Sequence, residues 1–217
     1  FIAHQLGGKG NVVEIGGLKG SSPAIERDRG FTEALKAYPD IKIVGRYYTD
    51  WQEERGAAVM DSILAQGMKI DYVFGQNDRI AAGARKLAMQ RGEKAIKFVG
   101  IDALPVAGGG MEDVRDGRLV ASYIYPTRGD LVMQLALNIL EKKPFHRDNY
   151  LKGTLVTIDN ANALLLQNEE IMKQTARLQS LHGKVDNYLA QYNHQKVYFL
   201  LFSIIVILVI GILVYAY

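Results

Sequence analysis

Short apolar runs, each bounded by glycine, proline or polar residues, recur along the first 160 residues of the chain. They are rich in valine, isoleucine and aromatic residues, a composition that favours β-strands. These runs predict strands at residues 11–15, 41–47, 71–75, 97–101, 119–125 and 153–158.

Between these runs, apolar residues recur every three or four positions, the period of an amphipathic helix. This spacing predicts helices at residues 22–38, 53–66, 78–91, 111–116 and 129–142. Strands that alternate with helices are typical of a parallel sheet with helices on both faces. We therefore expect an α/β fold.

A different pattern begins near residue 168. Apolar residues and two glutamines follow one another at alternating three- and four-residue spacings, as in a coiled coil. The positions of this seam are Ile171, Gln174, Leu178, Leu181, Val185, Tyr188, Tyr192 and Gln195. We favour a dimeric helical stalk over residues 161–196. The alternative is a single amphipathic helix that folds back on the first 160 residues.

Residues 197–217 form a run of twenty-one residues without a charge. A helix rises about 1.5 Å per residue, so this run is long enough to cross a hydrocarbon layer of roughly 30 Å. It predicts one transmembrane helix rather than a buried core helix. The sequence starts with Phe1 and stops within the apolar run, so we interpret it as part of a longer protein.

Composition excludes several functions. The net charge is only +3, which argues against a nucleic-acid partner, and the absence of cysteine excludes disulfides and thiolate metal sites. The four histidines show no metal-binding spacing, and Gly108–Gly110 lacks the residues of a phosphate-binding loop. We therefore expect no catalytic residue, metal or cofactor, and no enzyme activity, in these residues.

Three segments carry a family resemblance. They are Ser22–Phe31 (SPAIERDRGF), Val73–Asp78 (VFGQND, followed by AAGA) and Val99–Asp102 (VGID). In this order they resemble the periplasmic sugar-binding proteins of the ribose-binding, LacI-like type. The resemblance covers residues 1–160 and implies a type I fold, with two α/β lobes that hold a ligand between them. Residues 1–125 would form mainly the C-terminal lobe and 126–152 part of the N-terminal lobe, most of which is missing.

The resemblance also implies a ligand site. Four residues stand at positions that bind ligand in this family. Arg27 would bind sugar oxygens and Trp51 would stack on the sugar ring. The other two are the polar residues Asn77 and Asp102. The alternatives are a surface arginine, a core tryptophan, a helix cap and a turn-forming aspartate. For the helix cap, Asp78 is the better candidate.

Two further residues complete this predicted site. Leu18 matches a position that packs against ligand. Tyr125 stands where ribose binders place an amide, a departure that speaks against ribose itself.

A sugar-binding head followed by a stalk and a membrane helix resembles the sensor half of hybrid two-component systems of Bacteroides-like bacteria. We therefore expect a monosaccharide sensor that acts as a homodimer and signals to a cytoplasmic histidine kinase. It would lie in the bacterial inner membrane as a single-pass protein with residues 1–196 in the periplasm. The alternative is a membrane-anchored binding protein that feeds a sugar transporter. A LacI-type repressor does not fit the membrane helix.

Overall fold

The computed structural model describes residues 1–217, which divide into two compact units, Phe1–Leu166 and Gln167–Tyr217. The first unit contains one six-stranded sheet with the strand order β2-β1-β3-β4-β5-β6. The strands are β1 (Lys9–Gly16), β2 (Asp40–Tyr48), β3 (Tyr72–Gly75), β4 (Lys97–Val99), β5 (Ala121–Tyr123) and β6 (Leu155–Thr157). All six predicted strands are present, and the last three are shorter than expected.

The predicted helices are present as well. The structure has α1 (Ile2–Gln5), α2 (Ser22–Leu35), α3 (Glu53–Leu64), α4 (Asp78–Gln90), α5 (Gly110–Arg115), α6 (Gly129–Leu140) and α7 (Ala161–Ala216). Only α1 was not expected, because four residues are too few to show a helical period.

The sheet differs from the expectation at its last strand. β1 to β5 are parallel, but β6 runs antiparallel to β5, with Ser122 opposite Val156. The expectation of a parallel sheet is therefore correct for five strands and wrong for β6. The reason is that the connection between β5 and β6 leaves and returns at the same end of the sheet. Hydrophobic alternation does not reveal this direction.

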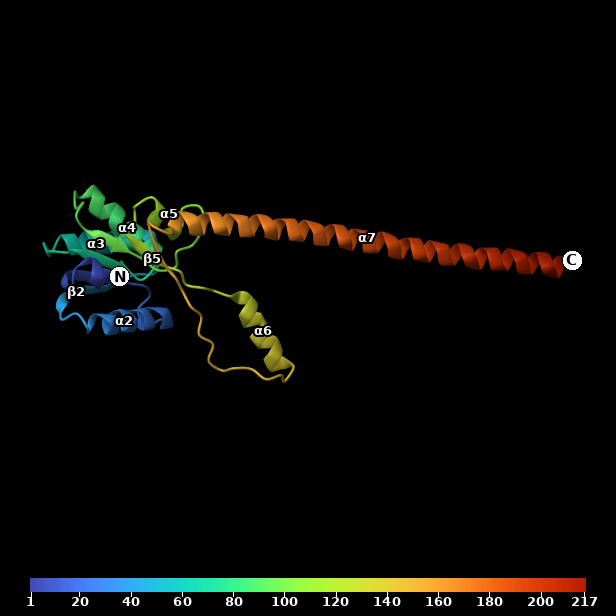
Figure 1. Ribbon diagram of the computed structural model, residues 1–217, viewed down its shortest axis with the longest axis horizontal. Coiled ribbons are helices and arrows are strands. Elements are labelled where there is room, and N and C mark those ends of the chain that lie inside the picture. The colour runs from blue at the N-terminus through green and yellow to red at the C-terminus, as the bar shows by residue number, and fades with distance from the viewer. The chain divides into compact units, whose positions relative to one another are not determined.

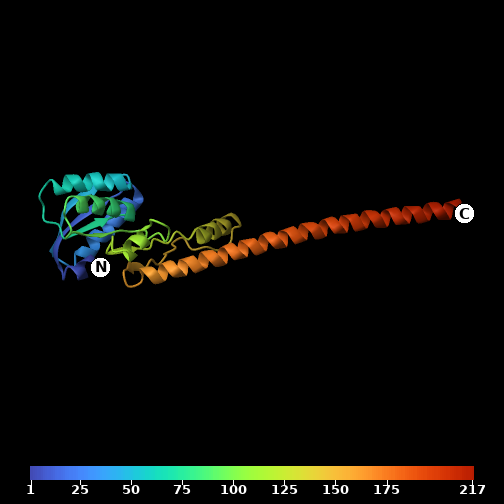
Figure 2. The ribbon, with the colours of Figure 1, turned by 90° about the horizontal axis from the view of Figure 1, so that it is seen from above.

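Successive strand residues point to opposite faces of the sheet, and both faces are covered. Val13, Ile15 and Val73 pack into a core with side chains of α3 and α4. Val12 and Phe74 face the other way and pack with side chains of α1 and α2. Figure 1 shows α2 and α4 on opposite sides of the sheet, and Figure 2 shows α3 and α4 side by side. The expected α/β fold with helices on both faces is confirmed.

The strand order places a topological switch point between β1 and β3. The chain passes from β1 to its neighbour β2 on one side, and then to β3 on the other side of β1. The loops after β1 and β3 therefore diverge at the carboxyl ends of their strands. In open α/β sheets this is the place where ligands bind.

The second unit, residues 167–217, consists of the continuation of α7. α7 is the one helix in the chain that is long and apolar enough to cross a membrane, as judged by length and composition. The apolar side chains of the predicted seam are all exposed: Ile171, Leu178, Leu181, Val185, Tyr188 and Tyr192. α6 in the first unit likewise buries none of its residues.

Candidate ligand-binding site

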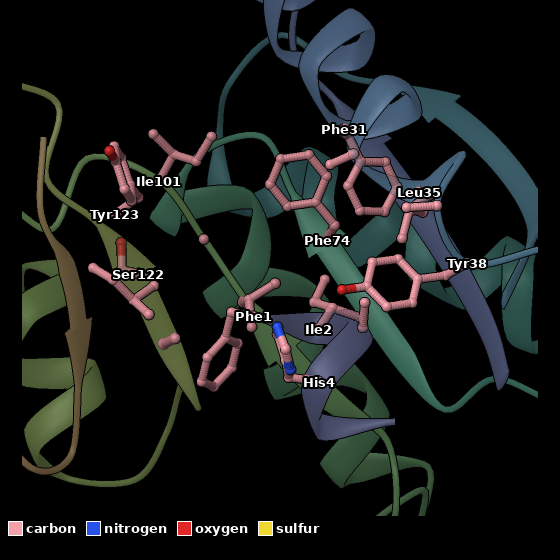
Figure 3. Close-up of a pocket in the computed structure, with 17 residues that line it drawn as sticks. Phe1, Ile2, His4, Phe31, Leu35, Tyr38, Phe74, Ile101, Ser122 and Tyr123 are labelled. Carbon is pink, nitrogen blue, oxygen red and sulfur yellow. The ribbon is translucent and has the colours of Figure 1, made fainter. Parts of the chain in front are cut away.

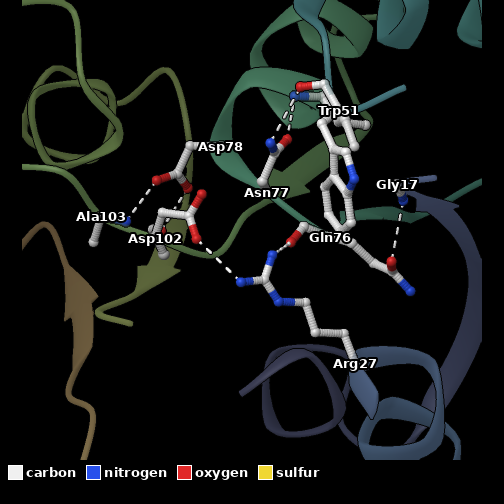
Figure 4. Close-up of polar contacts among 10 residues, drawn as sticks. Gly17, Arg27, Trp51, Gln76, Asn77, Asp78, Asp102 and Ala103 are labelled. Atoms are coloured by element: carbon white, nitrogen blue, oxygen red, sulfur yellow. Dashed lines mark hydrogen bonds and ion pairs between the residues drawn. The ribbon is translucent and has the colours of Figure 1, made fainter. Parts of the chain in front are cut away.

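Five of the six predicted ligand residues come together at the carboxyl ends of the strands. Arg27 projects from α2, and the other four follow four strands that are successive along the chain. These four are Trp51 after β2, Asn77 after β3, Asp102 after β4 and Tyr125 after β5. Figure 4 shows the guanidinium of Arg27 pointing towards Asp102, with the indole of Trp51 close by.

Arg27 is the centre of this group. Its Nη2 donates to Asp102 Oδ1 at 3.2 Å, and its Nη1 donates to the backbone carbonyl of Gln76 at 2.5 Å. The guanidinium carbon lies 5.5 Å from the ring centre of Trp51 and 5.3 Å from that of Tyr125, close enough for cation–π attraction. The Arg27 side chain is only 15% exposed, so the alternative of a free surface arginine does not describe it.

Asp102 is strained and partly buried. Its φ is 112°, and that of the following residue, Ala103, is 44°. Residues other than glycine rarely adopt these backbone angles. They raise the free energy of the folded chain, so neighbouring contacts are needed to stabilise them. Burial raises the pKa of the Asp102 carboxyl above its ordinary value, although the charge and hydrogen bond of Arg27 oppose this shift.

Trp51 is strained in the same way, with a φ of 73°. Its indole lies directly on Gly17, where a Cβ atom would overlap the ring. Asn77 Nδ2 donates to the carbonyl oxygen of Trp51 at 3.2 Å, and the Trp51 amide donates to Thr49 Oγ1 at 3.2 Å. The backbone of Trp51 is thus held from both sides.

Asn77, and not Asp78, caps α4. Its Oδ1 accepts a hydrogen bond from the Ile80 amide at 2.8 Å, and Asn77 is 7% exposed. The expectation that Asp78 is the better cap is wrong, because Asp78 lies inside the first turn of α4 and its carboxylate bonds elsewhere.

Leu18 and Tyr125 are the most exposed of the predicted residues. Leu18, in the loop after β1, is 56% exposed, and its carbonyl oxygen accepts a hydrogen bond from Ser21 Oγ at 2.7 Å. Tyr125 is 58% exposed, although its ring covers the guanidinium of Arg27.

A buried polar network beneath the site was not predicted. The side chain of Gln76 is fully buried: its Oε1 accepts from the Gly17 amide at 3.1 Å, and its Nε2 donates to Glu14 Oε1 at 2.8 Å. Glu14 also accepts from Arg46 Nε at 3.1 Å, and burial raises the pKa of its carboxyl to about 7. The sequence signals for this network are Glu14, which stands between the apolar residues Val13 and Ile15, and the polar run that follows β3.

An apolar pocket of about 540 Å³ lies on the face of the sheet covered by α1 and α2. Figure 3 shows that Phe31, Phe74 and Ile101 line it, with few polar side chains among them. A ligand rich in hydroxyl groups needs several hydrogen-bonding partners. The Arg27 cluster, which consists of Arg27, Trp51, Asn77, Asp102 and Tyr125, offers a cation, a carboxylate, an amide and aromatic rings, whereas this pocket is lined mainly by apolar side chains. No cluster of residues in the chain is suited to a metal ion.

Comparison with known proteins agrees with this fold. Residues 1–144 match the family profile of the periplasmic binding protein domain, and the chain belongs to this family. The ribose import binding protein of Escherichia coli is 31% identical over 156 residues, which are 72% of this chain and 48% of that protein. A xylitol-binding protein of Mycolicibacterium smegmatis is also 31% identical, over 63% of this chain and 39% of that protein. The chain thus spans less than half the length of these relatives.

Solved structures extend the similarity. The fructose-binding periplasmic domain of a hybrid two-component system is 45% identical, with a TM-score of 0.81 over 84% of this chain and 61% of that one. A solute-binding protein of an Actinobacillus succinogenes ABC transporter, solved with D-allose, is 26% identical, with a TM-score of 0.68 over 74% of this chain and 57% of that one.

Proposed function

We propose that this chain is the sugar-sensing part of a membrane receptor. It would bind a monosaccharide at the Arg27 cluster, between the lobe described above and a second lobe. Closure of the two lobes would change the position of α7, and a paired α7 would carry the change across the membrane to a cytoplasmic histidine kinase. The protein would lie in the inner membrane with its sugar-binding part in the periplasm.

The observation that supports this proposal most directly is the arrangement around Arg27. A guanidinium paired with a carboxylate provides both donors and acceptors for sugar hydroxyl groups, and such charge-assisted hydrogen bonds are the strong ones. The rings of Trp51 and Tyr125 offer apolar faces for sugar C–H groups. Relatives whose names state a sugar or a polyol as ligand share the fold.

Fructose is the first sugar to test. The fructose-binding domain is 45% identical to this chain, well above the other structures described here. Tyr125 in place of an amide also speaks against ribose. Half of the pocket belongs to the second lobe, so the choice of sugar depends on residues outside this chain as well.

The connection between the lobe and α7 supports a signalling role. Only three residues separate the end of β6 from the start of α7. Within this turn, Asn160 Oδ1 accepts from the Thr157 amide at 2.9 Å, and Asn160 Nδ2 donates to the Leu155 carbonyl at 2.9 Å. The first residue of α7, Ala161, is fully buried in the core of the lobe. A displacement of β6 would therefore reach the start of α7 directly.

The alternative is a membrane-anchored binding protein that delivers sugar to a transporter. The similarity to import binding proteins favours it. It requires no pairing of α7 and no kinase. The exposed apolar seam of residues 171–192 favours the sensor, because an anchor alone has no use for it.

The first prediction concerns the sugar site and is measured by calorimetry with D-fructose on the full-length protein. Arg27→Ala and Asp102→Ala should each weaken binding by about 1–3 kcal/mol, because each leaves a partly buried charged partner unpaired. Arg29→Ala is the matched control, since Arg29 lies two residues further along α2, is exposed and pairs with Glu26. Unchanged affinity in both variants would contradict the proposal that fructose binds at Arg27 and Asp102.

A further inference from the structure

Asp78 is a buried carboxylate that the ligand site does not use directly. It lies in the first turn of α4 and is 6% exposed. Its Oδ2 accepts a hydrogen bond from the amide of Ala103 at 2.6 Å, and its Oδ1 lies 2.5 Å from the hydroxyl of Ser122. Asp78 therefore links α4 to the loop after β4 and to β5.

The loop that Asp78 holds is the strained one. Asp102 and Ala103 both have positive φ, although neither is glycine. The same loop places the carboxylate of Asp102 against Arg27. Figure 4 shows the carboxylate of Asp78 reaching the Ala103 amide next to Asp102. Alanine has no intrinsic preference for positive φ, so the hydrogen bond that the Ala103 amide donates to Asp78 helps to hold this backbone conformation.

The space around Asp78 is shaped to admit its carboxylate. Gly100 precedes the strained loop, and Gly110 begins α5. A Cβ atom at either position would overlap an oxygen of Asp78. The buried carboxylate thus has a close-fitting socket in addition to its two hydrogen bonds.

We propose that Asp78 is a positioning residue for ligand binding, which holds the strained loop at residues 102–103 so that the Asp102 carboxylate faces Arg27 and the ligand. This inference rests on the proposed sugar-binding function. It also explains why Asp78 is buried, since a carboxyl group at this depth is costly unless it is hydrogen-bonded. Asn77 holds Trp51 on the other side of the site in a comparable way.

The test compares D-fructose binding by the full-length protein and its variants. Asp78→Ala should weaken binding about tenfold or more, because the Ala103 amide loses its partner and the loop relaxes. Asp78→Asn should bind within about threefold of the parent, since its amide can still accept from Ala103 and donate to Ser122. Adding Ala103→Gly to Asp78→Ala should restore part of the affinity, because glycine adopts positive φ without strain.

Asp113 provides the matched control. It is a buried carboxylate of similar exposure, 8%, on the neighbouring α5, and it pairs with Arg118 at 2.5 Å. Asp113→Ala should lower the unfolding temperature without weakening fructose binding. An equal loss of affinity in Asp113→Ala and Asp78→Ala, or none in Asp78→Ala, would overturn the proposal.

Hydrogen exchange of the Ala103 amide tests the same contact without a ligand. In the parent protein this amide should exchange slowly although it lies in a loop, and Asp78→Ala should accelerate it. Rapid exchange in the parent would overturn the proposal. If the parent protein binds no sugar but its Ala103 amide exchanges slowly, the proposed function is contradicted. The conclusion that Asp78 stabilises the loop at residues 102–103 would then still be supported.

Discussion

At the scale of single residues, the candidate site combines strained ligand residues with buried polar side chains that hold them. Trp51, Asp102 and Ala103 have positive φ. The side chains of Asn77 and Asp78, which are adjacent in the sequence, bond the backbone of Trp51 and of Ala103 respectively. Such backbone strain persists only where the surrounding structure enforces it. The N-cap and first residue of α4 therefore hold two sides of the candidate site.

The buried carboxyl groups predict a pH dependence of stability. Burial is the largest cause that raises the pKa of Asp78 to about 7, with the carboxylates of Asp102 and Asp113 adding to it, and burial raises that of Glu14 to about 7 as well. In the unfolded chain both groups ionise near pH 4. Between pH 4 and pH 7 the folded chain therefore binds more protons than the unfolded chain, and the free energy of unfolding decreases as pH rises.

We expect the chain to be more stable at pH 5.5 than at pH 8, by about 1–2 kcal/mol for each group. Thermal unfolding followed by the fluorescence of Trp51, the single tryptophan, measures this difference. Asp78→Asn and Glu14→Gln should each reduce it, because the substituted side chain does not ionise. Equal unfolding temperatures at the two pH values would contradict this account.

At the scale of elements, α7 carries two patterns in one helix. Its apolar seam over residues 171–192 is exposed along its whole length, and the uncharged run over 197–217 follows in the same helix. An exposed stripe with heptad spacing is the surface that a coiled coil buries. We therefore propose that two copies of α7 pair along the seam.

Cysteine cross-linking in membranes tests this pairing. Cysteine at Leu178 or Val185 should form disulfides between two copies, because both positions lie on the seam. Cysteine at Gln179, one residue off the seam, is the control and should cross-link poorly. Similar yields at the three positions would argue against a paired stalk.

At the scale of the whole molecule, we propose that the lobe described here forms one side of a ligand site. α6 buries none of its side chains, and the related fructose-binding domain extends well beyond the part matched by this chain. We propose that α6 and its flanking segments belong to the second lobe. In this proposal, ligand would close the lobes only to the extent that it binds the closed form more tightly than the open one.

The sensor and the transporter readings differ in how the stalk responds to sugar. If the protein is a sensor, D-fructose should change the rate of cross-linking between cysteines at Leu178, because closure moves the start of α7. Asp102→Ala should abolish the change, which separates a binding effect from an unspecific one. A rate that fructose leaves unaltered, in a protein that binds it, would favour the transporter reading.

The order of strands and helices, the apolar run over 197–217 and the family motifs could all be predicted from the sequence, because they depend on local spacing and residue type. The family resemblance led to Arg27, Trp51, Asn77, Asp102 and Tyr125, which lie together in the structure. Their roles in ligand binding remain predictions.

Only the tertiary structure decided the rest. The antiparallel course of β6, the hydrogen bonds of Gln76 and the reach of Asp78 to Ala103 join residues far apart in the chain. Such pairings depend on how the sheet brings strand ends together, which periodicity along the sequence does not contain.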